Sequence, residues 1–205
     1  LSFCADHFVE DFNSMTNSGY AATSASLPSG FWSVSQVCKE DAVASRGGSG
    51  SAARINDDTV GAHLTTPPED TVGTVSFYYR ELNTGGGTFQ VQKSIAGGAY
   101  SNVASQAFSG TSFVYFSTNV NDSSSAIRIR ILNDNNPGHL IIDDMTVTTY
   151  STDEYPPSVT ITNPSVESLE STARTYTVSG TCNTGAVGLL RWTNSLTGSS
   201  GQIAA

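Results

Sequence analysis

The stretches Val75-Ser76-Phe77-Tyr78-Tyr79-Arg80 and Ile127-Arg128-Ile129-Arg130-Ile131 decide the fold class, because apolar and polar side chains alternate along both. A period of two residues is the pattern of a β-strand that is buried on one face and solvated on the other. No segment of the sequence repeats its apolar residues at the helical period of 3.6. The sequence therefore predicts an all-β protein.

Further short apolar runs recur through residues 1–150, separated by turn residues such as Asn83-Thr84-Gly85-Gly86-Gly87 and Ala96-Gly97-Gly98. The two glycine-containing stretches that flank Thr88–Lys93 are typical of hairpin loops. The runs predict strands at His7–Asn13, Gly30–Val37, Ser51–Asn56, His63–Thr65, Gly73–Leu82, Gly87–Ser94, Ser112–Val120, Ala126–Leu132 and Leu140–Thr149.

The sequence predicts two domains. Residues 1–150 form the first, and residues 151–157, which end in Pro156-Pro157, read as a stiff linker. Residues 158–205 hold three more candidate strands, Ser158–Thr162, Thr175–Ser179 and Gly188–Trp192. A complete immunoglobulin-like sandwich needs about 100 residues, so this second domain is predicted to be partial.

The charge of the chain bears on its partners. The formal net charge is −9 and the pI is about 4.5, so an evenly acidic surface would repel nucleic acids and anionic lipids. No apolar run has the roughly 18–20 residues needed to cross a bilayer. We expect neither nucleic-acid binding nor membrane insertion.

Four short segments follow one another along residues 1–150, namely Phe8-Val9-Glu10-Asp11-Phe12, Gly50-Ser51-Ala52-Ala53-Arg54, Gly73–Arg80 and Ile142-Asp143-Asp144-Met145-Thr146-Val147. Their order resembles the jelly-roll domains of bacterial secreted and cell-surface proteins, of the cleaved-adhesin or MAM-like type and related carbohydrate-binding modules. The resemblance implies a jelly-roll β-sandwich over residues 1–150.

A second resemblance begins after the linker. Pro156–Pro164, Thr177–Thr181 and Leu190–Asn194 are similar to the first half of a bacterial immunoglobulin-like domain, a type that usually acts as a spacer. The absence of a second half from this sequence would leave strand edges that another chain could complete, so self-assembly is one expectation.

The two resemblances imply an extracellular, secreted or cell-surface module of a larger bacterial polypeptide that binds polysaccharide or cell-surface glycan, or acts in adhesion. One alternative is a structural spacer or assembly domain of a surface protein or fibre. A second is a small glycoside-active enzyme, since two carboxylates at the right separation suffice for that chemistry. The sequence has no Gly-x-Ser-x-Gly elbow, no His-Glu-x-x-His and no Gly-x-x-x-x-Gly-Lys loop, so we expect no enzyme.

The resemblance also implies a structural calcium ion that links an acid near the first strand to one in the last. The matching positions are Glu10 or Asp11 and Asp143 or Asp144. Of two adjacent carboxylates on a strand, one points inward and needs a cation or hydrogen-bond donors. Calcium, a partner such as Arg54 or a backbone group, and simple exposure remain open as alternatives.

Alternation predicts which side chains face outward. If Val75, Phe77 and Tyr79 are buried, the opposite face carries polar and aromatic side chains that suit sugar hydroxyls or acidic groups. We expect the outward ligand-binding set to share one sheet face and to comprise Tyr78, Arg80, Gln90, Gln92, Arg128 and Arg130. The alternative is an ordinary solvated strand face.

Loop aromatics give a second candidate. Phe31-Trp32 follows Pro28-Ser29-Gly30, and Tyr100 follows Gly97-Gly98-Ala99. Trp32 is therefore a candidate stacking platform for a sugar, with a core position as the alternative. Cys4 and Cys38 are a candidate disulfide in an oxidising compartment, with two small buried thiols as the alternative.

Overall fold

The computed structural model describes residues 6–41, 45–150, 159–163, 179–182, 189–193 and 197–204. Contacts divide the chain into two units, one of Cys4–Ser151 and one of Leu1–Phe3 with Thr152–Ala205. Among the described residues, no helix is long and apolar enough to span a bilayer.

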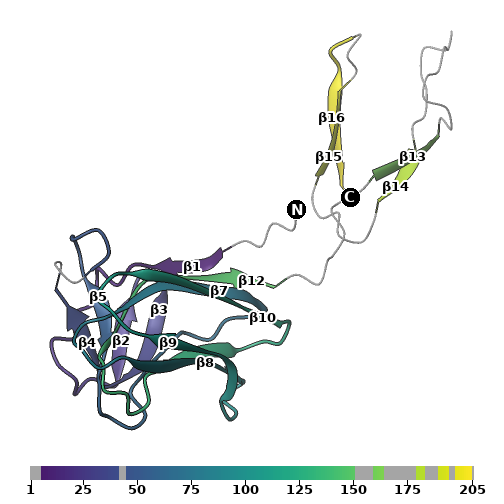
Figure 1. Ribbon diagram of the computed structural model, residues 1–205. Helices are drawn as coiled ribbons and strands as arrows, with labels where there is room; N and C mark the ends of the chain where they lie inside the picture. The colour runs from purple at the N-terminus through teal and green to yellow at the C-terminus, as the bar shows by residue number, and fades with distance from the viewer. Residues whose placement is uncertain are drawn as a thin grey trace. The chain divides into compact units, whose positions relative to one another are not determined.

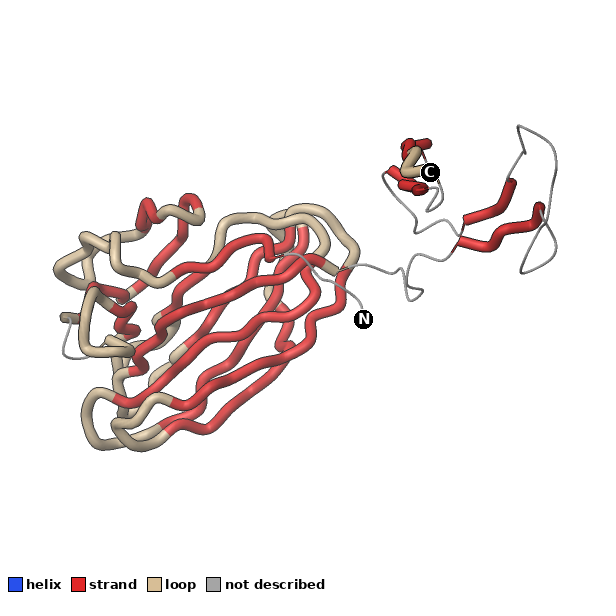
Figure 2. The backbone as a smooth tube through the Cα atoms, turned by 90° about the horizontal axis from the view of Figure 1, so that it is seen from above, coloured by secondary structure: helices blue, strands red, loops and turns tan. Residues whose placement is uncertain are grey.

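The first unit is a sandwich of two six-stranded antiparallel sheets (Figures 1 and 2). Sheet A has the order β10-β7-β12-β5-β4, and β1 also pairs with β12. Its strands are β1 (Asp6–Glu10), β4 (Val37–Glu40), β5 (Ala52–Ile55), β7 (Val72–Glu81), β10 (Val114–Asp122) and β12 (Leu140–Thr149).

Sheet B has the order β2-β3-β6-β11-β8-β9. Its strands are β2 (Ser24–Leu27), β3 (Gly30–Ser35), β6 (His63–Thr65), β8 (Gly87–Ile95), β9 (Ser101–Phe108) and β11 (Ile127–Leu132). The all-β prediction is confirmed.

The core lies between the two sheets and forms as the alternation predicts. Val75 and Phe77 are 0% exposed, and Tyr79 is 6% exposed. Phe89 of sheet B packs against the rings of Phe77 and Tyr79 of sheet A, with centroids 5.6 and 5.0 Å apart. These contacts join the inner faces of the sheets into one apolar cluster.

One of the two predicted hairpin loops is found in the fold and the other is not. The stretch Asn83–Gly87 is not a hairpin loop, because it carries the chain from β7 in sheet A to β8 in sheet B. The stretch Ala96–Gly98 does form a hairpin loop, between the paired strands β8 and β9, and Ala96 and Gly97 have positive φ there.

The second unit contains two separate antiparallel pairs among its described residues. β13 (Val159–Asn163) pairs with β14 (Ser179–Cys182), and β15 (Leu189–Thr193) pairs with β16 (Ser200–Ala204). The predicted linker 151–157 lies outside the described residues. The immunoglobulin-like assignment stays a prediction.

Candidate functional site

The predicted ligand-binding set is divided between the two sheets. Tyr78 and Arg80 lie on β7 of sheet A, whereas Gln90, Gln92, Arg128 and Arg130 lie on β8 and β11 of sheet B. All six point away from the core, as predicted, but on opposite sides of the sandwich. The expectation that they share one face is therefore wrong.

A polar row crosses all six strands on the outer face of sheet B. Successive cross-strand pairs, from β2 to β9, link Ser24, Ser33, Thr65, Arg130, Gln92 and Asn102. We call these residues the central row. Since neighbouring strands lie about 4.8 Å apart, the central row is about 24 Å long.

A second row runs beside it, from Ser35 through His63, Leu132 and Gln90 to Ser105. Gln92 donates from Nε2 to Gln90 Oε1 at 2.9 Å, which joins the two rows. The sequence prediction missed His63, Thr65, Asn102 and Ser105. The last two lie on β9, whose small and polar side chains show no alternation that could assign them to a face.

Two polar atoms in the middle of the central row lack partners. Thr65 Oγ1 and Arg130 Nε are buried and make no hydrogen bond, and the two residues are directly paired across the strands. Buried polar groups are usually satisfied by protein, water or ligand. Both atoms lie beneath the surface of the row, and a ligand would reach them only after the side chains that cover them have moved.

Aromatic rings border the same face. The Arg130 guanidinium lies 3.5 Å from the centroid of the Tyr100 ring, which comes from the β8–β9 loop. Phe31 alternates with the buried Trp32, so it points outward, and it is 66% exposed. Exposed aromatic rings next to amides and guanidinium groups are suited to stacking on sugars.

His63 contributes a hydrogen-bond acceptor to this face. Burial, helped by the charge of Arg130, lowers the pKa of His63 from its usual 6.5. The neutral ring places Nδ1 2.7 Å from Gly61 O, so Nδ1 carries the proton and donates it there. Nε2 is then the acceptor.

Trp32 is a core residue and not a stacking platform. It is 0% exposed, its ring packs edge-on against Phe8 and Phe12, and Nε1 donates to Ser29 Oγ at 2.9 Å. A large ring between two aromatic neighbours gains more from burial than from exposure. The exposed aromatic residue of this stretch is Phe31.

On sheet A, Tyr78 and Arg80 belong to a separate aromatic surface. Tyr78 packs against Tyr115 with ring centroids 5.2 Å apart. The Arg46 guanidinium lies 3.8 Å from the centroid of the Tyr78 ring. Arg80 lies 5.3 Å from the ring of Phe113 and donates to Thr111 O. These arginines are engaged with the protein itself.

An open cleft of about 570 Å³ lies at the β4 edge of sheet A. Its lining comprises Met15, Thr16, Ser18, Lys39, Glu40, Asp41 and Arg54. None of the predicted ligand-binding residues lines it. Arg54 and Glu40 form an ion pair at 2.5 Å, so two of the four charged groups that line the cleft compensate each other.

Cys38 lies on β4 beside this cleft as a buried free thiol, 1% exposed. Cys4, the other half of the predicted Cys4–Cys38 disulfide, lies outside the described residues, so that disulfide stays a prediction. Burial and the adjacent Cys38 raise the pKa of Tyr20 to about 12.

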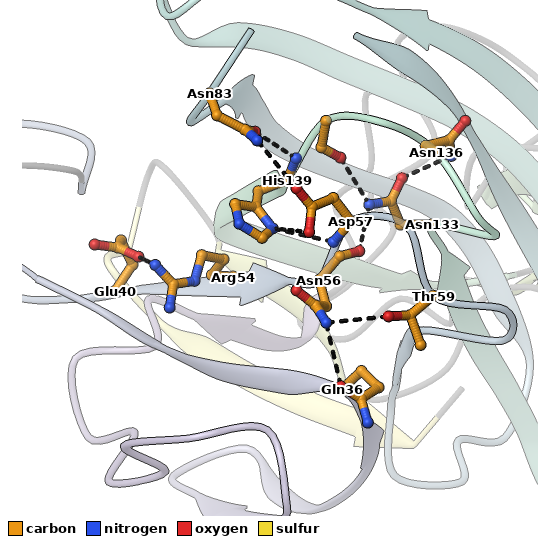
Figure 3. Close-up of polar contacts among 11 residues, drawn as sticks. Gln36, Glu40, Arg54, Asn56, Asp57, Thr59, Asn83, Asn133, Asn136 and His139 are labelled. Atoms are coloured by element: carbon orange, nitrogen blue, oxygen red, sulfur yellow. Dashed lines mark hydrogen bonds and ion pairs between the residues drawn. The ribbon is translucent and has the colours of Figure 1, made fainter. Parts of the chain in front are cut away.

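His139 and His7 have structural partners. His139 Nδ1 accepts from the Asp57 backbone N–H at 3.0 Å, and Asn83 donates to Asp57 Oδ2 at 3.0 Å (Figure 3). Burial lowers the pKa of His139, so its ring is neutral at pH 7. His7 lies 3.3 Å from Glu69 Oε2 and is bonded to Thr71 O.

The four predicted calcium ligands do not gather around one point. Glu10 is buried inside the sandwich, where its carboxylate accepts from Phe12 N, Ser29 N and Ser29 Oγ. Asp143 accepts from Arg46 N and Asp144 N on the outside of sheet A. Among the described residues, no group of three or more His, Cys, Asp or Glu could hold a metal ion.

An arginine occupies the position where the resemblance implies a cation. The Arg46 guanidinium donates to Asp144 Oδ2 at 2.5 Å, and its backbone N–H donates to Asp143 at 2.7 Å. Asp11 instead accepts from Asn13. The side chains as arranged do not fit a calcium ion, and calcium binding itself stays a prediction.

Asp143 should give the protein an unusual pH dependence. Its burial raises the pKa from 3.8 to about 6, so between these values the folded state binds the proton more tightly than the unfolded state. Its contribution to stability should therefore fall as the pH rises from about 4 to 6. Melting temperatures from pH 4 to 7 should show this trend in the difference between wild type and Asp143→Asn.

The comparison with Asp143→Asn is needed because His63 and His139 have lowered pKa values, and these make the stability rise with pH. At pH 7, a chelator should leave the melting temperature unchanged. A marked fall on adding the chelator would show that calcium replaces the Arg46 contacts.

Comparisons with known proteins concern the first unit. No family model matches the chain, and no curated protein matches it. The K2 cleaved adhesin domain of Lys-gingipain is 13% identical, with a TM-score of 0.55, covering 71% of this chain and 98% of that one. The K1 domain of the same protein from Porphyromonas gingivalis W83 is 11% identical, with a TM-score of 0.52, covering 70% and 98%.

A further solved structure is a carbohydrate-binding module. The CBM22-1 xylan-binding domain of Paenibacillus barcinonensis Xyn10C is 10% identical, with a TM-score of 0.50, covering 74% of this chain and 99% of that one. At these identities the likeness concerns the fold. The fold predicted from the first resemblance is confirmed.

Proposed function

We propose that this chain is a non-catalytic carbohydrate-binding or adhesion module of a larger extracellular, secreted or cell-surface protein. It binds polysaccharide or cell-surface glycan on the outer face of sheet B. The observation that carries the proposal is the central row itself, a line of polar side chains that crosses all six strands of sheet B. An extended chain of sugars laid along that row would exchange hydrogen bonds with its amides, hydroxyls and guanidinium group.

The shape of this face supports an extended ligand. The central row spans six paired strands, with one register shift at Gln92 between β8 and β9, so its side chains are held by paired backbone and not by loops. Gln90 and Gln92 each offer an amide, which both donates and accepts hydrogen bonds as sugar hydroxyls do. The fold shared with a xylan-binding domain and with adhesin domains is consistent with this use.

The double variant Gln90→Ala/Gln92→Ala should bind its polysaccharide about tenfold more weakly than wild type. Each lost hydrogen bond costs about 0.5–1.5 kcal/mol, and 1.4 kcal/mol is a factor of ten in affinity. Affinity gel electrophoresis across a panel of neutral and acidic polysaccharides gives the measurement.

The matched control is Asn119→Ala, which removes an exposed amide from β10 on sheet A. This variant should bind like wild type. Equal binding by the double variant and wild type would move the site away from sheet B, and failure of wild type to bind any polysaccharide would remove the proposed function.

A further inference from the structure

The strands of the two sheets differ sharply in charge. The six strands of sheet B, all fully described, contain no Asp or Glu, although the chain carries a net charge of −9. Their basic residues are Lys93, Arg128 and Arg130. The strands of sheet A hold the acids Asp6, Glu10, Glu40, Glu81, Asp122, Asp143 and Asp144.

The two arginines, but not the lysine, present this charge to solvent. Lys93 pairs with Ile129, which faces the core, and its ammonium group donates to Asp122 of sheet A at 2.7 Å. That bond lowers the pKa of Asp122 to about 2. Within the part of the chain that the structure describes, neither Arg128 nor Arg130 forms an ion pair.

Acids that adjoin these strands in the chain are already bonded elsewhere. Glu69 pairs with His7, Asp70 accepts from Ala126 N, and Asp134 accepts from Gly61 N. These contacts hold the loop carboxylates at the ends of the strands. The positive charge of the outer face of sheet B is therefore left for a ligand.

The geometry of the two guanidinium groups suits an anionic group. Tyr100 covers one plane of the Arg130 guanidinium and Nε is buried, so the terminal N–H groups are the ones that can donate to a ligand. Arg128 uses one nitrogen for Thr66 O at 3.0 Å. The arginines are two residues apart on one strand face, so their Cα atoms lie about 7 Å apart.

We infer that the ligand of this face is an acidic polysaccharide, whose carboxylate or sulfate groups are bound by Arg128 and Arg130. This inference rests on the proposed function and names the ligand class of the same site. Arginine forks bind carboxylate and sulfate oxygens through paired, charge-assisted hydrogen bonds. Outside this face an acidic protein repels a polyanion, so binding is confined to it.

The test compares three kinds of polysaccharide with the whole chain: polygalacturonate for carboxylate, dextran sulfate for sulfate ester, and xylan and galactan as neutral chains. Wild type should be retarded by an acidic polysaccharide and not by the neutral ones. Retardation by only polygalacturonate or only dextran sulfate identifies the bound group as carboxylate or sulfate. The affinity should fall steeply between 50 and 500 mM NaCl, and this measurement needs no variant.

Arg128→Gln and Arg130→Gln should each weaken binding at least about tenfold. Arg130→Lys keeps the charge but loses the fork, and should fall between wild type and Arg130→Gln. Arg80→Gln, on sheet A, is the matched control and should bind like wild type. Melting curves confirm that each variant is folded.

Three outcomes would overturn the inference. If wild type binds neutral polysaccharides as tightly as acidic ones, and only the Gln90→Ala/Gln92→Ala variant binds more weakly, the proposed function stands and the acidic ligand is wrong. Equal losses in Arg80→Gln and Arg130→Gln would show unspecific charge attraction. Absence of binding to every chain would remove the proposed function and the inference together.

Discussion

Replacement of Trp32 by alanine is expected to lower the free energy of unfolding by about 3–5 kcal/mol, the usual cost of truncating a large core aromatic side chain. Trp32 is 0% exposed and contacts Phe8 and Phe12 edge-on at 5.6 Å each. Its truncation also removes the Nε1–H group that donates a hydrogen bond to Ser29 Oγ, and Ser29 Oγ in turn donates to the buried Glu10. The cavity and the loss of this hydrogen bond both lower the stability of the folded state.

Urea denaturation followed by fluorescence and circular dichroism measures this loss. The control is Phe31→Ala, at the neighbouring residue, whose ring is 66% exposed. A surface substitution of this kind changes stability by no more than about 0.5 kcal/mol. Similar losses in the two variants would contradict the burial of Trp32 and return it to the binding candidates.

The variant Asn133→Asp should destabilise the sandwich by about 3 kcal/mol or more at pH 7. Asn133 is 0% exposed, and its Nδ2 donates to Asn56 O at 2.8 Å and to Gly138 O at 3.0 Å (Figure 3). An aspartate of the same shape would place a carboxylate oxygen against both carbonyl oxygens. A buried carboxylate that has one oxygen against two carbonyl acceptors, and a single donor, Asn136 Nδ2, on its other oxygen, is among the costliest single changes.

The penalty should shrink as the pH falls. Protonation of the introduced carboxyl group restores one donor, so the difference in stability between Asn133→Asp and wild type should decrease toward pH 4. The control is Asn119→Asp, where the amide is exposed on β10. Denaturation of both variants at pH 7 and pH 4 gives the comparison, and a pH-independent penalty would contradict the role of Asn133 as a donor.

The sequence predicted the central strands of the sandwich and missed three of its five edge strands. The missed strands β2, β4 and β9 each lie at the edge of a sheet. An edge strand has one neighbour and often two partly solvated faces, so its apolar alternation is weak, as in Ser101–Phe108. The other two edge strands, β1 and β10, were predicted, and β10 was indicated by Phe113, Val114, Tyr115 and Phe116.

Alternation also predicted which way the candidate ligand residues point, but not on which sheet they lie. Gly85 to Gly87 can turn the chain within one sheet or lead it to the other, and local residues do not distinguish the two paths. The separation of Arg80 from Arg130 depends on pairings such as Arg130 with Thr65 and Gln92, which are distant in sequence. The alternation of side chains along a strand is a local pattern and does not predict such long-range pairings.

The contrast between the acid-free strands of sheet B and the acid-bearing strands of sheet A makes the sandwich an electric dipole across its thickness. Near a negatively charged surface, such a body rotates before it touches, so that sheet B arrives first. A module that approaches in the wrong orientation is reoriented by the field before contact, which raises the rate of productive association at low ionic strength.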